Sequence, residues 1–435
     1  MGRDRLRRTR LAGVAGTGVL VLAACAGTGS PAVRLAAGPA PATVDVPAGL
    51  PVGAVSTATA TAASTATATG SPATRPSSSP SSSPSASIGA SEGTLRVLAL
   101  QGRVEYGGTS TKVDWVTPYE ERTGCRVVAL DRVRTGEEMA ARFEGGSYDV
   151  VSPPPELAGT LMAAGGVAPV DTSLIKAYDD IPGWLRELPA LRWKDAVYGV
   201  PYLWGVNRVV HGGSRDGARD GGYGGPGDLY TAGPVAIRND PLSIADAALA
   251  LAGTGRDLGV SDPFRLTPAQ LDAAAGLLAE RDGPDRVYWN DPVEVVRAMA
   301  SGSVRLAQAW PYHADLFERA GRPLETFGTA PATGWADSWM ISATAASPNC
   351  AYRWLDWVAS AEAQRWAAAW TGLAPANPGA CTGRARRVCE VYGARDGKRP
   401  EGVFFAVRPS RDCGGAGGEC TDYADWASRW KALVK

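Results

Sequence analysis

A long stretch of small and polar residues limits how much of this chain can form a hydrophobic core. Residues 26–93 consist mainly of Ala, Thr, Ser, Pro and Gly, and they include the run SSSPSSSP at residues 77–84. Such a composition buries too little apolar surface to offset the conformational entropy lost on folding. We therefore predict a disordered tether at residues 26–93 and a folded part at residues 94–435, which is long enough for more than one domain.

The first 25 residues have the pattern of an export signal. Five arginines lie within the first ten residues, and the apolar run that follows at 11–24 is too short to span a bilayer comfortably. The run ends in LAAC, which looks like a lipobox whose cysteine, Cys25, receives a diacylglycerol. An uncleaved signal anchor is the alternative. We predict a lipoprotein signal peptide at 1–25 and a protein held by its lipid on the outer face of the bacterial cell membrane.

Six cysteines remain in the exported part of the chain. They are Cys125, Cys350, Cys381, Cys389, Cys413 and Cys420. An even number in an oxidising compartment indicates disulfides, for which fifteen pairings are possible. The last four form two closely spaced pairs that would close short loops, and elimination would then join Cys125 to Cys350. A zinc cluster is the weaker alternative, because the spacings are wide and no histidine is near.

Charge and histidine content exclude several classes of function. The chain has 44 basic and 44 acidic side chains, whereas a general nucleic-acid binder needs an excess of basic residues. Only two histidines exist, so a His-rich metal centre cannot be built. A phosphate-binding Walker loop is absent from the sequence, and every cysteine has a lipid or disulfide role. We therefore expect no nucleic-acid partner, no metal, no cofactor and no enzymatic activity.

Short β-rich runs alternate with helical patterns in the first half of the folded part. The expected strands lie at 95–100, 126–130 and 148–152, and the expected helices at 115–123, 137–143 and 157–164. This rhythm predicts a parallel or mixed sheet covered by helices. Ligands of such sheets bind at the loops beyond the carboxyl ends of the strands.

A second α/β block follows. Its expected strands lie at 235–237 and 304–309 and its helices at 244–251 and 268–279, and a glycine-rich surface loop is expected between His211 and Gly227. A strand at 339–342 and one long helix at 350–370 come after this block. We predict lobe 1 at 94–203 with 337–375 returning to it, lobe 2 at 204–336, and a disulfide-stapled C-terminal segment at 376–435. A cleft between two such lobes is the usual place for a small-molecule site.

Seven segments, taken together, resemble a known family. They lie at 115–125, 148–152, 198–205, 244–249, 334–337, 347–352 and 374–378. In this order they resemble the extracellular solute-binding proteins of ABC importers, specifically the spermidine/putrescine branch. The resemblance implies an α/β fold of the two-lobed periplasmic-binding-protein type II, with hinge crossovers and a ligand cleft. It also implies a monomeric receptor that binds a small solute and delivers it to a permease and its ATPase.

The resemblance assigns candidate ligand residues. Trp335 and Asp337 match the Trp-x-Asp of the family, in which the aspartate anchors an amine, and Trp310 matches a cleft tryptophan. Asp240 matches a terminal carboxylate, and Glu156 lies where the family has an aromatic residue. Aromatic faces and carboxylates suit a flexible dication such as putrescine or spermidine. Two further tryptophans, Trp204 and Trp289, are candidates for the cleft walls.

Other positions depart from the polyamine pattern. Ser243 stands where the polyamine receptors carry an acid, and the first strand ends in LQGR at 100–103 without the Trp-Thr-x-Tyr of the family. A single amine anchored at Asp337 is equally consistent with an amino acid such as γ-aminobutyrate. A polymer-synthase-like enzyme, whose nucleophile would have to be Cys125 or Cys350, and a surface scaffold are the alternatives of other classes.

Overall fold

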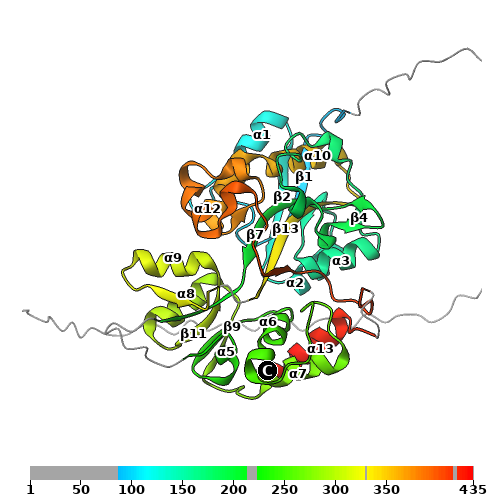
Figure 1. Ribbon diagram of the computed structural model, residues 1–435. Coiled ribbons are helices and arrows are strands. Elements are labelled where there is room, and N and C mark those ends of the chain that lie inside the picture. Colours follow the sequence, from blue (N-terminus) through cyan, green and yellow to red (C-terminus); the bar gives the residue numbers. More distant parts are fainter. Residues whose placement is uncertain (1–86, 213–222, 329–330, 415–418, 435) are drawn as a thin grey trace, which may run out of the picture. The chain divides into compact units, whose positions relative to one another are not determined.

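The computed structural model describes residues 87–212, 223–328, 331–414 and 419–434. The predicted signal peptide with Cys25, most of the predicted tether and most of the loop expected between His211 and Gly227 lie outside the described residues. All described residues belong to one compact unit, residues 81–435. This unit contains two larger β-sheets with helices packed on them (Figure 1).

The first sheet is built on parallel β-α units, as the alternating pattern predicted. Its strand order is β14-β7-β13-β3-β1-β2, and β1 pairs in parallel with both β2 and β3. The elements of its first half are β1 (Thr94–Leu100), α1 (Thr117–Thr123), β2 (Arg126–Val133), α2 (Gly136–Gly145), β3 (Val150–Ser152) and α3 (Pro155–Ala163). Gly124 ends α1 in the left-handed conformation, which glycine adopts without steric cost. The three parallel strands therefore place their following loops at the same edge.

The second sheet has the strand order β10-β9-β11-β8-β12. Its strands are β8 (Arg208–Gly212), β9 (Val235–Arg238), β10 (Arg286–Trp289), β11 (Leu306–Ala309) and β12 (Leu324–Thr326). Its helices are α5 (Asp228–Thr231), α6 (Ser243–Ala250), α7 (Pro268–Ala279), α8 (Pro292–Ser301) and α9 (Pro311–Arg319). A capping box between Thr267 and Gln270 fixes the start of α7 where the sequence predicted it.

Shorter elements complete the fold. They are β4 (Val167–Ala168), α4 (Gly183–Arg186), β5 (Arg192–Trp193), β6 (Ala196–Val197), β14 (Ala374–Pro375) and the 3-10 helices η1 (Thr172–Leu174), η2 (Pro189–Leu191), η3 (Ala252–Thr254), η4 (Pro378–Ala380), η5 (Gly383–Ala385) and η6 (Ala394–Asp396). The 2-residue strands β5 and β6 pair with each other.

Two crossings connect the sheets. Strand β7 (Val200–Val206) belongs to the first sheet and continues through Asn207 into β8 of the second. Strand β13 (Ala332–Ser342) follows β12 and pairs along its length with β7, β15, β3 and β4. The Asn207 amide donates to the Thr333 hydroxyl at 2.8 Å, and that hydroxyl donates to Asp246 of α6 at 2.8 Å. These bonds tie both crossings to one helix of the second sheet.

The C-terminal segment makes a third connection. Strand β15 (Val403–Phe405) pairs in parallel with β13, and α13 (Tyr423–Leu433) packs against α7 of the second sheet. The indole of Trp430 donates to the Asn239 side chain at 2.9 Å, and Arg429 pairs with Asp272 at 2.9 Å. Helix α12 (Arg386–Tyr392) in turn contacts α9. The chain therefore passes from the first sheet to the second once more after the two crossings.

The helix expected at 350–370 is interrupted, which corrects the sequence-based prediction. Two helices occur instead, α10 (Pro348–Ala359) and α11 (Ala361–Thr371). Ser360 between them is extended, with φ −68° and ψ 148°, and its hydroxyl accepts from the backbone N–H of Ala363. Serine favours this N-cap conformation because its side chain satisfies a backbone N–H that has no partner within the helix. The strand expected at 339–342 is likewise only the end of the 11-residue β13.

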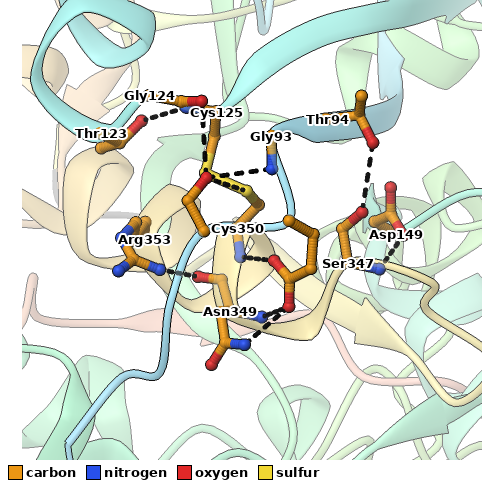
Figure 2. The surroundings of a disulfide bond; sticks show 12 residues. Gly93, Thr94, Thr123, Gly124, Cys125, Asp149, Ser347, Asn349, Cys350 and Arg353 are labelled. Atoms are coloured by element: carbon orange, nitrogen blue, oxygen red, sulfur yellow. Dashed lines mark hydrogen bonds between the residues drawn. A yellow bond between two sulfur atoms is a disulfide. The ribbon is translucent and has the colours of Figure 1, made fainter.

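The structure contains the three disulfides that loop length and elimination favoured. They are Cys125–Cys350, Cys381–Cys389 and Cys413–Cys420. Cys125 immediately precedes β2, and Cys350 lies in α10. This bond therefore joins a strand of the first sheet to a helix that packs on that sheet. Figure 2 shows this disulfide and the residues around it. The carboxylate of Glu92 accepts a hydrogen bond from the backbone N–H of Cys350 at 2.9 Å.

Candidate functional site

Loops from both sheets meet beside the crossing strand β13. Arg103 follows β1, Glu156 follows β3, and Arg238 and Asp240 lie at the end of β9 and just after it. With Asp337 of β13 these residues, which we call the charged cluster, line a cavity of about 30 Å³. That volume is close to the share of one water molecule in the liquid. A solute therefore needs the side chains or the sheets to move apart.

Asp337 and Arg103 form the most buried ion pair of the charged cluster. Arg103 Nε donates to Asp337 Oδ2 at 2.5 Å, and the exposed fractions of the two side chains are 11% and 3%. The backbone carbonyl of Arg103 accepts from the Tyr202 hydroxyl at 3.2 Å, which fixes the loop after β1 against β7. The carboxylate that the resemblance assigns to a ligand amine is thus held by a guanidinium of the chain itself.

A second guanidinium lies on the other side of the cavity. Arg238 Nη2 is 3.2 Å from Asp240 Oδ2, and its guanidinium carbon lies 5.0 Å from the centre of the Trp335 ring. A cation over an indole face is attracted by the ring quadrupole. The ring of Trp335 packs so closely on Gly205 of β7 that a side chain at that position would collide with it. Glycine at 205 therefore sets the position of Trp335.

Glu156 is the unusual member of the charged cluster. Its side chain is buried at the start of α3, and its Oε2 has no hydrogen-bond partner among the described residues. Burial, and next the charge of Asp240, raise the pKa of Glu156 to about 8, and Asp337 acts in the same direction while Arg238 opposes it. The raised pKa favours the protonated carboxyl of Glu156 in the folded state at neutral pH.

The raised pKa predicts how stability depends on pH. The unfolded chain loses the Glu156 proton near its ordinary pKa of 4.5, whereas the folded chain keeps it to about pH 8. Stability therefore falls as pH rises through this window. We expect Glu156→Gln to remove this loss and to stabilise the protein at pH 8 by roughly 2 kcal/mol or more relative to its effect at pH 4. Urea unfolding at several pH values measures the difference, with exposed Glu401→Gln as the control; an effect of Glu156→Gln that does not change with pH would contradict it.

The remaining aromatic candidates lie behind the charged cluster. The rings of Trp310 and Trp335 are 5.2 Å apart, and Trp310 stacks on His313 at 5.1 Å. Trp289 packs edge-on against Trp310, and its indole donates to the backbone of Gln308 at 3.0 Å. Of these rings only Trp335 borders the cavity in the described part of the chain. Trp310 and Trp289 thus extend the aromatic wall away from the cavity.

Trp204 has a different environment. It belongs to β7, packs edge-on against Trp184 and Tyr392, and donates from its indole to the carbonyl of Pro375 at 3.2 Å. It does not border the cavity in the residues that the structure describes. The structure thus brings Trp335, Asp337, Asp240 and Glu156 together and leaves Trp204 among packing aromatics of the first sheet.

The C-terminal segment lies next to the charged cluster. Ala406, just after β15, borders the cavity, and the side chain of Arg408 lies close against Gly159 of α3. Burial raises the pKa of Tyr423, and the charges of Glu156 and Asp240 raise it further. Ala406, Arg408 and Tyr423 of this segment therefore lie near the two carboxyl groups that come from different sheets. Spacing within the sequence contained no signal for this contact.

A serine pattern outside the cavity has no catalytic geometry. The spacing Gly-x-Ser-x-Gly occurs at 89–93, ahead of β1 rather than between a strand and a helix. The Ser91 hydroxyl lies 3.1 Å from Cys125 Sγ and 3.3 Å from Cys350 Sγ, beside the disulfide that these cysteines form. Within the described residues, no group of three or more His, Cys, Asp and Glu side chains is placed to hold a metal ion. None of the described helices is both long and apolar enough to cross a bilayer.

Comparison with known proteins identifies the fold. Residues 228–384 match the family of bacterial extracellular solute-binding proteins. PotD, the spermidine/putrescine substrate-binding protein of Streptococcus pneumoniae, superposes with a TM-score of 0.56 over 79% of this chain and 99% of its own, at 16% identity. The chain has the fold of an extracellular solute-binding protein. Its α/β architecture with two sheets, crossing strands and a cavity between them is that of the periplasmic binding proteins, as predicted.

Two further solute-binding proteins share this fold. MotA of A. tumefaciens B6, in complex with glucopine, has a TM-score of 0.55 at 20% identity and covers 78% of this chain and 97% of its own. A GABA receptor has a TM-score of 0.57 at 19% identity, with 78% of this chain and 97% of its own covered. This fold therefore occurs in proteins described with different ligands, glucopine and GABA among them.

Two residues of the site were not among the sequence-based candidates. Arg103 was noted only because the segment LQGR at 100–103 departs from the polyamine pattern, and Arg238 was not a candidate. The partners Arg103 and Asp337 are 234 positions apart in the chain. Arg103 follows β1 and Arg238 ends β9, so each lies at the carboxyl end of a parallel strand of its own sheet, and this was the one available signal for the two arginines.

Proposed function

We propose that this protein is the solute-binding receptor of an ABC importer and that it binds a small amine-bearing solute at the charged cluster. The observation that carries the proposal is the convergence of Glu156 from the first sheet and Asp240 from the second on the crossing strand that holds Asp337. Carboxylates and an aromatic face are the groups that hold an alkyl ammonium. Polyamines and amino acids such as γ-aminobutyrate are the candidate solutes.

The arrangement supports a closure mechanism. The cavity is nearly filled when the sheets lie as they do here, so the solute enters an open state and is then contacted from both sheets. A ligand shifts such an equilibrium only through its higher affinity for one state. Contacts to Arg103 or Glu156 on one side and to Arg238 or Asp240 on the other exist together only in the closed state. A permease and its ATPase would recognise that state, and the lipid on Cys25 would keep the receptor near them.

A thermal-shift titration of the purified full chain tests this function. The solutes are putrescine, spermidine, γ-aminobutyrate and a neutral sugar. We expect a saturable rise in Tm with an amine-bearing solute, which Asp240→Asn abolishes. Asp315→Asn is the control, because Asp315 is likewise an aspartate paired with arginine but does not border the cavity. No shift with any solute, or an unchanged shift in Asp240→Asn, would overturn the proposal.

A further inference from the structure

The charged cluster contains its own cations. Arg103 is held by Asp337 at 2.5 Å and Arg238 by Asp240 at 3.2 Å. Guanidinium groups stay protonated in proteins, so both positive charges are permanent. Each of the two aspartates that the resemblance assigns to ligand ammonium groups therefore already has a cationic partner.

The charge balance of the cavity follows from these residues. Its lining carries two arginines and three carboxyl groups, which gives two minus three, a net charge of −1, if every group is ionised. The raised pKa of Glu156 removes one negative charge, and the lining is then neutral. A diamine would bring the closed site to a net charge of +1 or +2. Burial of uncompensated charge is strongly unfavourable.

A solute with one ammonium and one carboxylate leaves this balance unchanged. Its carboxylate can bind one of the guanidinium groups. Its ammonium can then bind the aspartate that this guanidinium no longer contacts. The planar guanidinium suits a carboxylate especially well, because it donates two parallel N–H bonds. The carboxyl of Glu156, whose Oε2 is buried and has no hydrogen-bond partner among the described residues, offers the ammonium a further acceptor at the same cavity, because even a protonated carboxyl accepts through its carbonyl oxygen.

We propose that the solute is a zwitterion, an amino acid whose carboxylate is bound by Arg103 or Arg238 and whose ammonium is bound by the carboxylates of the charged cluster. This inference rests on the proposed receptor function. It names the chemical class of the ligand and makes the two arginines specificity-determining residues. The cavity between these side chains, about 30 Å³, is too small for an amino acid. The site must therefore open before the solute can replace the aspartate partners of the two arginines.

Three solutes with the same four-carbon chain separate the possibilities. Putrescine has two ammonium groups, γ-aminobutyrate has one ammonium and one carboxylate, and succinate has two carboxylates. Calorimetry of the full chain with each, and with the homologues one carbon shorter and longer, is expected to give at least 100-fold tighter binding of the amino acids than of the diamines and diacids. Tighter binding of a diamine or a diacid would overturn the zwitterion while the receptor function stands. If none of these solutes binds, both the zwitterionic ligand and the proposed receptor function are overturned.

A charge-removing variant gives a second readout. Arg103→Met frees the carboxylate of Asp337 for an ammonium, so we expect amino-acid affinity to fall at least 10-fold and putrescine affinity to rise. Arg132→Met is the control, because Arg132 is likewise paired with a buried carboxylate, that of Glu105 at 3.3 Å, and does not border the cavity. A loss of affinity for both solutes alike would mean that Arg103 has only a structural role.

Discussion

Replacing Cys125 and Cys350 together by alanine is expected to lower the free energy of unfolding by about 5 kcal/mol. The two cysteines are 225 positions apart, so their bond removes far more conformational freedom from the unfolded chain than a local disulfide does. Both are fully buried, and the bond ties the start of β2 to α10. Urea unfolding of the double variant, followed by circular dichroism, measures the loss.

The C-terminal disulfide provides the matched control. Cys413 and Cys420 are only 7 positions apart, and the same chain-entropy reasoning gives a loss of about 2.5 kcal/mol when both become alanine. Equal losses for the two double variants, or a loss below about 1 kcal/mol for the Cys125 and Cys350 variant, would contradict a loop-length origin of the stability.

Replacing Asp337 by asparagine is expected to cost about 3–5 kcal/mol of stability, because it leaves the buried guanidinium of Arg103 without its carboxylate. The side chain of Arg103 is only 11% exposed, so water cannot take over that role without a rearrangement of the loop after β1. Combining Asp337→Asn with Arg103→Met removes the unpaired charge, so the double variant should recover most of the stability that the single variant loses. Chemical unfolding of the two single variants and the double variant forms the required cycle.

A second buried aspartate shows what distinguishes this pair. Asp315 of α9 is held by Arg387 at 2.5 Å and by Arg319 at 3.0 Å, but both arginine side chains are about half exposed, at 50% and 51%. Because these guanidinium groups can turn to water, Asp315→Asn should cost only about 1 kcal/mol. A comparable loss in the two asparagine variants would show that burial of the arginine does not decide the cost.

Local patterns were sufficient to predict most of the secondary structure. The alternation of apolar strands with helical runs predicted β1, β2, β9 and α7 to within a few residues, because each element carries its own hydrophobic period and its own end signals. The break at Ser360 was missed because apolar residues continue with helical spacing on both sides of it. Only the N-cap preference of serine indicated the interruption.

The charged cluster was only partly predictable. Trp335, Asp337 and Asp240 were found through the family resemblance, which compares residues position by position. The pairing of Arg103 with Asp337 depends on the way β13 crosses between the sheets, and neither residue carries a local mark of the other. The approach of Tyr423 to Glu156 is likewise a tertiary contact that no periodicity in the sequence indicates.

A crystal structure of the full chain grown with γ-aminobutyrate tests the binding site most directly. The solute should lie between the two sheets with its carboxylate on the guanidinium of Arg103 or Arg238 and its ammonium on Asp337, Asp240 or Glu156, in a cavity larger than the present 30 Å³. A cleft that stays empty at saturating solute, with Arg103 still on Asp337, or a solute bound away from the charged cluster, would contradict this assignment of the site.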